Sequence, residues 1–193
     1  MAQIQDPVTA VAAKVSASGA INVTAGGDGY PTYIVQIYSP RVTTAIGAGG
    51  VLWAIRAPAT KTLDIRNGQI RLSLDTVTTG EVGVEMVRFS TSDPAGGTLY
   101  VARPKNTAEP AASTTAIRGA SATAGLTGMT VEATTNALLH ISLPFIAGSA
   151  DTLDLADWTG LYLAPGEGLA IRTNPTAAPI GLTLSGWMEF SER

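Results

Sequence analysis

The only histidine of the chain, His140, is its clearest candidate for proton-transfer chemistry. In a strand, Leu138, His140 and Ser142 would share one face, which places a hydroxyl beside the imidazole. No Gly-x-Ser-x-Gly motif is present to hold a serine nucleophile on a sharp turn. One histidine also cannot build a multi-histidine metal site. We therefore expect His140 to be an ordinary strand residue, and we expect no catalytic residue and no enzymatic activity.

The densest acidic cluster of the sequence consists of Asp151, Asp154 and Asp157. Three carboxylates in a loop are suitable ligands for a hard cation such as Ca²⁺. However, Leu153 and Leu155 interleave with them, and the Asp-x-Asp-x-Asp-Gly pattern of a calcium loop is missing. We expect solvated carboxylates in a polar excursion over residues 149–158, and no metal site.

Two glycine-rich stretches, at residues 26–29 and 47–50, resemble nucleotide-binding loops only in composition. Neither carries the Lys-Ser/Thr of a phosphate loop or the strand-to-helix context of a dinucleotide site. The chain has no cysteine, which excludes thiol catalysis, thiolate metal sites and disulfides. We expect these stretches to be connectors, and we expect no cofactor.

The composition points to a protein that buries apolar surface against other protein. Charged residues make up 14% of the chain, against roughly 25% in a typical soluble domain, and mean hydropathy is +0.22. The net charge of −3 provides no basic field for nucleic acid. No run approaches the ~18 apolar residues that a membrane helix requires. We therefore expect a homo-oligomer that binds neither nucleic acid nor membrane.

Alternating apolar and polar residues dominate the chain after residue 30, and Val, Ile and Thr are frequent. Roughly eight to ten short strands separated by Gly and Pro turns indicate an all-β, antiparallel β-sandwich of jelly-roll type, at residues 31–193. A long loop is expected over 103–130, with one short strand near 116–118. The other expected strands cover residues 32–38, 51–56, 61–67, 69–75, 81–90, 98–102 and 136–144, two short strands around Pro165–Gly168, and a closing strand over 180–190.

Residues 1–30 lack this alternation and are expected to form an extended N-terminal arm that anchors the domain to a partner. A short helix is expected within 1–15. Its apolar residues recur at spacings of three and four, which gives one apolar face for capsid anchoring. These residues are Ile4, Val8, Val11 and Val15. The alternatives are a disordered tail and a strand exchanged between subunits.

The aromatic residues divide into core and surface candidates. Trp53 lies in an apolar run and is expected in the core. Trp187 alternates out of phase with the apolar residues Ile180, Leu182, Leu184, Met188 and Phe190, and is therefore expected to point away from them. Because aromatic residues concentrate at subunit contacts, we expect Trp187 and Tyr162 at a subunit interface. The alternative for such side chains is a sugar-stacking surface.

Several segments resemble a family of structural proteins of tailed bacteriophages. They are Val51-Leu-Trp-Ala-Ile-Arg-Ala-Pro58, Thr60-Lys-Thr-Leu-Asp-Ile-Arg66, Val87-Arg-Phe-Ser-Thr91, Gly96-Gly-Thr98 and Leu163-Ala-Pro-Gly-Glu-Gly-Leu169. Similar phage proteins carry a tryptophan and basic strand, an Arg-Phe strand, a polar loop and a Pro-Gly-Glu turn in this order. The resemblance covers roughly residues 50–190.

The resemblance implies a jelly-roll virion protein, often trimeric, that decorates or cements a capsid. The implied partners are the major capsid protein and further copies of the chain. The implied location is the capsid surface of the virion, after synthesis in the host cytoplasm. The alternative function is a tail- or head-associated module that binds a receptor or glycan.

Overall fold

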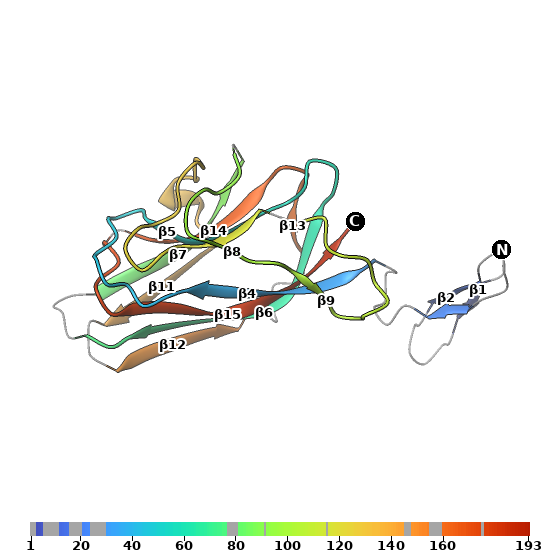
Figure 1. The fold of residues 1–193 in the computed structure, drawn as a ribbon, viewed down its shortest axis with the longest axis horizontal. Helices are drawn as coiled ribbons and strands as arrows, with labels where there is room; N and C mark the ends of the chain where they lie inside the picture. The colour runs from blue at the N-terminus through green and yellow to red at the C-terminus, as the bar shows by residue number, and fades with distance from the viewer. Residues whose placement is uncertain are drawn as a thin grey trace.

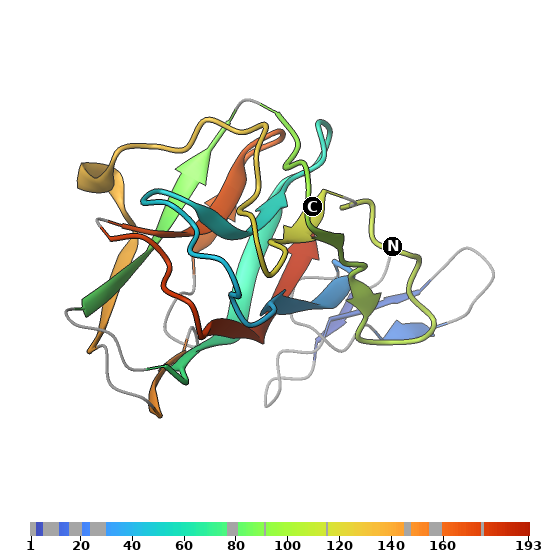
Figure 2. The same cartoon turned by 60° about the vertical axis from the view of Figure 1, so that its left-hand side comes forward.

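The computed structural model describes residues 3–5, 12–15, 21–23, 30–76, 81–90, 92–114, 116–144, 148–154, 160–174 and 176–193. Two antiparallel sheets face each other and form a β-sandwich (Figure 1). A three-residue 3-10 helix, η1 (Thr134–Asn136), lies at the end of the sandwich remote from the N-terminus in both ribbon views (Figures 1 and 2). The all-β antiparallel sandwich predicted from the alternation is confirmed, whereas its jelly-roll connectivity stays a prediction.

Each large sheet has six strands. The first runs in the order β11 (Leu139–Pro144), β7 (Glu81–Phe89), β14 (Gly168–Thr173), β5 (Val51–Arg56), β10 (Ile117–Gly119) and β8 (Thr98–Leu99). The second runs in the order β12 (Ser149–Asp154), β6 (Leu63–Leu74), β15 (Leu182–Glu192), β4 (Thr32–Ser39) and β9 (Arg103–Pro104), and β13 (Leu161–Leu163) also pairs with β6.

The core lies between the sheets and follows the alternation of the sequence. On β4, Tyr33, Val35 and Ile37 are buried, while Ile34 and Gln36 are exposed. On β15 the buried apolar residues are Leu182, Leu184, Met188 and Phe190, whereas Ile180, which precedes the strand, is 43% exposed. The inward face of the closing strand was therefore predicted correctly except at Ile180.

The central position of β5 is confirmed. It pairs with β14 on one side and with β10 on the other, and Trp53 is fully buried. A strand with partners on both sides and cover on both faces is expected to be apolar throughout. The outward face of its sheet carries a second, smaller core that includes Ala54, Val87 and Phe89.

One prediction about β6 was wrong in an instructive way. Two strands were expected on either side of Gly68, but a single strand runs from Leu63 to Leu74. Its pairing with β15 is irregular between Glu189 and Phe190, where the register skips Arg66. The irregularity moves the buried positions from Leu63 and Ile65 to Ile70, Leu72 and Leu74. The sequence alternation shifts by one residue at this point. That shift predicted a turn at Gly68, but it corresponds to an irregularity in the pairing of one continuous strand.

Two other connections differ from expectation. Residues 149–158 were predicted as a polar excursion, but Ser149–Asp154 forms the edge strand β12, paired with β6. The strand predicted at 98–102 contains only Thr98 and Leu99. The short strand predicted near 116–118 is confirmed as β10.

The predicted helix within residues 1–15 is wrong for the residues described there. They form β1 (Gln3–Gln5) and β2 (Ala12–Val15), which join β3 (Ile21–Val23) in a three-stranded antiparallel sheet. Pro7 opposes a helix through this segment, because proline lacks the N–H of the helical ladder. Figure 1 shows β1 and β2 beyond the end of the sandwich. The role of residues 1–30 as an anchoring arm stays a prediction.

Candidate functional site

The outward face of the second sheet carries a row of side chains centred on Trp187. The register places Gln36 of β4 and Gln69 of β6 directly opposite Trp187, one on each side. Directly opposite residues in an antiparallel pair share a face, so the three side chains form one line across three strands. Trp187 is 36% exposed, and both glutamines are exposed. The prediction that Trp187 points away from the core is confirmed.

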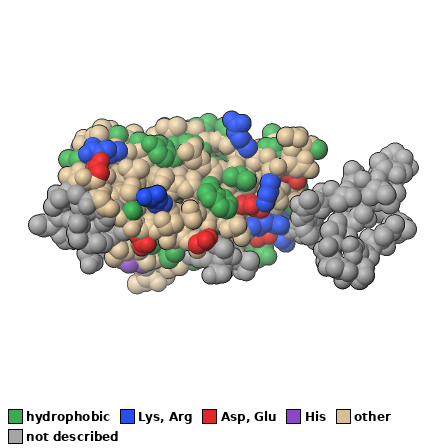
Figure 3. All heavy atoms as spheres, turned by 90° about the horizontal axis from the view of Figure 1, so that it is seen from below, with side chains coloured by type: hydrophobic (Ala, Val, Ile, Leu, Met, Phe, Trp, Pro, Cys, Tyr) green, Lys and Arg blue, Asp and Glu red, His purple; other side chains and the backbone are tan. Residues whose placement is uncertain are grey.

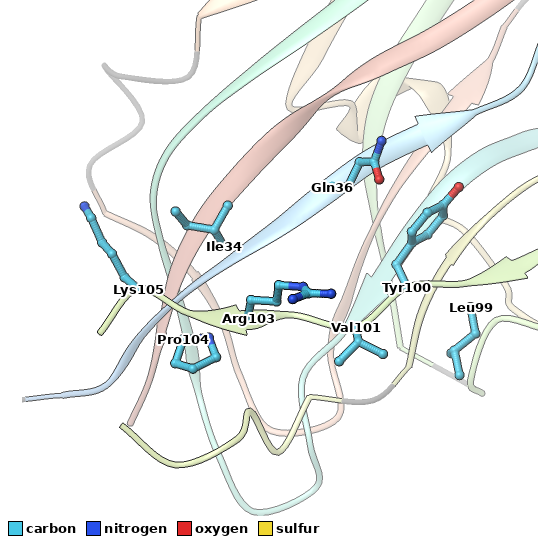
Figure 4. Close-up of a pocket in the computed structure, with 8 residues that line it drawn as sticks. All are labelled: Ile34, Gln36, Leu99, Tyr100, Val101, Arg103, Pro104 and Lys105. Atoms are coloured by element: carbon cyan, nitrogen blue, oxygen red, sulfur yellow. The ribbon is translucent and has the colours of Figure 1, made fainter. Parts of the chain in front are cut away.

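A groove of about 610 Å³ adjoins this row. Its walls are β4 and the segment that carries the chain from β8 in one sheet to β9 in the other (Figure 4). β9 pairs with β4 only at Tyr33 and Ile34, so the two segments diverge beyond that point. The lining residues are Ile34, Gln36, Leu99, Tyr100, Val101, Arg103, Pro104 and Lys105.

Apolar side chains are unusually open to solvent around this groove. Ile34 is 38% exposed, Leu99 51% and Val101 75%. Seen from below, the molecule shows hydrophobic side chains together with both basic and acidic side chains on the visible face (Figure 3). Because grouped exposed apolar side chains are characteristic of binding surfaces, this groove is the candidate binding surface of the chain.

Basic side chains line the same groove. The Nζ of Lys105 lies 2.9 Å from Glu189 Oε2, and that carboxylate is only 15% exposed. Arg103 is exposed, and its guanidinium has no hydrogen bond or ion pair to another residue of the described part of the chain. In Figure 4 its side chain extends along the segment toward Val101, while Lys105 points away from it. Among the described residues, the groove therefore presents a guanidinium without a counter-charge beside apolar surface.

Tyr162, the other predicted interface residue, lies elsewhere. It is 44% exposed on β13, and the guanidinium carbon of Arg193 lies 5.4 Å from its ring centre. The ring of Tyr30 lies on the same guanidinium at 5.3 Å. Arg193 also pairs with Asp64 through its Nη2, at 2.6 Å. Tyr162 thus belongs to a cation–π cluster around Arg193. The partner of Tyr162 on β6 is Asp64, five residues along the strand from the Gln69 that lies opposite Trp187.

His140 lies at the rim of the other sheet, beside a buried carboxylate. Its Nε2 is 3.3 Å from Ser142 Oγ and its Nδ1 is 3.5 Å from Glu85 Oε1. The side chain of His140 is 47% exposed, whereas that of Glu85 is fully buried. This order of serine, histidine and carboxylate is the order found in hydrolytic triads.

The partners of Glu85 favour a structural role for this cluster. Arg172 donates from Nε and Nη2 to Oε2, at 3.3 and 3.2 Å. Asn174 Nδ2 lies 3.0 Å from both carboxylate oxygens. The charge of Glu85 is therefore balanced by Arg172, and its contact with His140 is the longest of the set. Ser142 stands two residues along the same strand, exposed, without the strained turn that presents a hydrolase nucleophile.

The aspartates of the acidic cluster lie at a sheet edge. Asp151 and Asp154 are exposed on β12, while Asp157 lies outside the described residues. Among the described residues no group of three or more His, Cys, Asp or Glu is arranged to hold a metal ion. The Oδ1 of Asp151 accepts a hydrogen bond from the N–H of Thr152, which is a local contact.

The predicted anchoring residues are only partly placed. Ile4 lies on β1, where it pairs with Ala13, and Val15 lies on β2, where it pairs with Ile21. Val8 and Val11 lie outside the described residues. Ile4 lies opposite Ala13, which shares one face of β2 with Val15, so Ile4 and Val15 lie on one face of a sheet and not on the predicted helical face.

The sequence did not identify the groove. Leu99, Val101 and Arg103 lie in the segment where a strand and a long loop were predicted. Ile34 was assigned correctly to the outward face of its strand, yet nothing local shows that it meets a segment about seventy residues later. The only sequence signal was the pair Leu99 and Val101 in an otherwise polar, turn-rich region.

We found no match to this chain among protein-family models, curated proteins or solved structures. Within the described residues, no helix has the length and apolar character needed to cross a membrane.

Proposed function

We propose that this chain is a structural protein of a bacteriophage virion, which assembles as a homo-oligomer and binds and stabilises the capsid. The sequence resemblance over residues 50–190 supports the virion assignment. The observation that carries the assembly role is the exposure of Ile34, Leu99 and Val101 around one groove. The jelly-roll connectivity, the trimeric state and the contact with the major capsid protein belong to this proposal.

The mechanism of stabilisation would be the burial of apolar surface between neighbouring proteins. Each Å² of apolar surface removed from water contributes about 25 cal/mol. Side chains as open as Leu99 and Val101 gain most from such burial. Repeated contacts on a lattice add multivalency, so modest individual contacts suffice for tight attachment.

The test combines the size of the free protein with its binding to particles. Sedimentation should give a mass several times 19.7 kDa, and the protein should co-sediment with capsids that lack it. A Val101→Asp change should weaken one or both, because it places a charge on the most exposed apolar side chain of the groove. Monomeric protein that leaves capsids unchanged would overturn the proposal.

A second function is favoured by the line of Gln36, Trp187 and Gln69. An exposed indole flanked by two amides provides a stacking surface and paired hydrogen-bonding groups. This chemistry suits a pyranose ring, and the adjoining groove would extend the site to an oligosaccharide. The chain would then be a receptor- or glycan-binding module attached to the phage head or tail.

Glycan binding has its own readout. Trp187→Ala should abolish retention on a glycan array, whereas Tyr162→Ala, which removes an exposed aromatic ring away from the row, should not. Under the structural-protein proposal the array shows no binding by either form.

A further inference from the structure

The two edges of the second sheet carry opposite charges. β12 forms one edge, where Asp151 is exposed, and β9 forms the other, where Arg103 is exposed. At ~4.8 Å between neighbouring strands, the edges lie roughly 19 Å apart. That separation exceeds the ~8 Å screening length at physiological ionic strength. One copy therefore cannot neutralise its acidic edge with its own basic edge.

The position of Asp151 disfavours most partners at the acidic edge. Asp151 lies opposite Leu72, whose side chain is buried, so Asp151 leaves its strand on the core-facing side of the sheet, at the rim. A charge in this position opposes pairing with an apolar or an acidic strand edge. A basic partner compensates for it, and such a repulsive element gives specificity.

The basic edge supplies the complementary features. The guanidinium of Arg103 has no hydrogen bond or ion pair within the described residues, and Val101 and Ile34 offer apolar surface beside it. On the acidic edge, Leu153 is half-buried and follows Asp151 at the two-residue spacing of one strand face. The guanidinium of Arg103 is thus complementary to the carboxylate of Asp151, and the apolar groove is complementary to Leu153.

We propose that copies of this chain associate head to tail, with the β12 edge of one copy seated in the β4–β9 groove of the next and Asp151 facing Arg103. Such a contact joins two different surfaces, so it closes into a ring where the rotation between copies permits. β12 is the terminal strand of its sheet among the described residues, so the backbone on its outer side adds hydrogen-bonding groups to the contact. This inference deepens the proposed self-assembly, but it does not depend on the capsid as partner.

Charge reversal tests the contact. Arg103→Glu and Asp151→Lys should each weaken association at least ~100-fold in sedimentation equilibrium, because each juxtaposes like charges. The double variant Arg103→Glu with Asp151→Lys should regain most of the affinity. Glu132→Lys, the same change at an exposed site off both edges, is the control and should leave association unchanged. Circular dichroism establishes that each variant is folded.

Cysteine cross-linking gives a second readout, because the chain has no cysteine of its own. Val101→Cys combined with Thr152→Cys should form a covalent ladder on oxidation, ending at the ring size, while each single variant should give no ladder. Efficient dimer formation by Val101→Cys alone would show a two-fold contact and overturn the proposal. Monomeric protein, or association insensitive to both reversals, would also overturn it. Intact rings that fail to bind capsids would instead contradict only the virion function.

Discussion

The hydroxyl of Thr114 donates a hydrogen bond of 2.8 Å to Glu192 Oε1, although 78 residues separate the two in sequence. The same oxygen accepts from the N–H of Thr114, at 2.7 Å. The other carboxylate oxygen accepts from the N–H of Ser113, at 3.0 Å, and from Lys61 Nζ, at 2.9 Å. Glu192 therefore ties the loop before β10 to the last strand of the sandwich.

Thr114→Val should destabilise the protein by about 1–2 kcal/mol, because it keeps the side-chain shape and removes one donor from a buried carboxylate. Ser39→Ala is the matched comparison. The Oγ of Ser39 is buried and has no hydrogen-bond partner among the described residues, so its removal should be neutral or slightly stabilising. Urea denaturation measures both changes. Equal losses in the two variants would contradict this account of the Glu192 contacts.

The pKa of Glu192 predicts how stability depends on pH. Burial raises this pKa, but hydrogen bonds from Lys61, Thr114 and the N–H of Ser113 outweigh burial and lower it below 4.5. The unfolded chain therefore binds a proton on this group more readily than the folded chain does. Its contribution to stability is complete above about pH 4.5 and is lost as the pH falls through the lower folded value.

Glu192→Gln should accordingly flatten the fall in unfolding free energy below pH 4.5, the ordinary pKa of the group. Asp75→Asn is the control. The hydrogen bond from Arg41 lowers the pKa of Asp75 as well, but that pair is exposed to solvent and its contribution is screened. The measurement is the melting temperature between pH 3 and 7, a range that includes the titration of carboxyl groups. A profile that Glu192→Gln leaves unchanged would argue against the prediction.

A close approach between the sheets predicts a strong effect at Gly119. A Cβ at this position would collide with the backbone oxygen of Tyr38, so β10 reaches β4 only because residue 119 has no side chain. Gly119→Ala should cost about 2–3 kcal/mol through displacement of β10. Gly47→Ala, with nothing within 4 Å of the added Cβ, should change the unfolding free energy little. Similar midpoints for the two variants would show that β10 moves without cost.

Two substitutions test whether the cluster around Glu85 stabilises the fold or catalyses hydrolysis. Glu85→Gln should destabilise by roughly 3 kcal/mol, because it leaves the buried Arg172 guanidinium without its counter-charge. His140→Ala should cost less than about 0.5 kcal/mol, since the imidazole is half exposed. Hydrolysis of an activated ester should be equal for the unaltered protein and His140→Ala. An esterase activity that disappears with His140 would make the serine–histidine pair catalytic.

Much of the sandwich was predictable because its strands obey a local rule. Burial of Tyr33, Val35 and Ile37 follows from their two-residue spacing, and burial of Trp53 follows from the apolar run around it. β12 was missed because its aspartates suggested a loop, while pairing with β6 outweighed their low strand propensity. Local sequence therefore predicted which strands have a core face, but it was weaker where a neighbouring strand decided the outcome.

The candidate surface was beyond the reach of local patterns for a related reason. Leu99 and Val101 form part of a groove only because the chain crosses from one sheet to the other beside Ile34. The contact of Thr114 with Glu192 likewise depends on how a loop folds back on the last strand. In both cases the fold brings together two segments that are far apart in the sequence. The spacing of residues within either segment does not predict that contact.

The last prediction concerns the N-terminal residues. The small sheet of β1, β2 and β3 has few residues per strand, and strands this short bury too little to be stable without a partner. Deleting residues 2–26 should leave the sandwich folded and oligomeric, because its core residues begin at Tyr33. It should weaken attachment to capsids if the segment carrying Ile4 and Val15 is the anchor. Co-sedimentation with capsids lacking the protein, beside circular dichroism and sedimentation of the free variant, measures each effect. Unchanged capsid binding would refute the anchoring role, whereas loss of the folded oligomer would show that the N-terminal strands belong to the subunit contact.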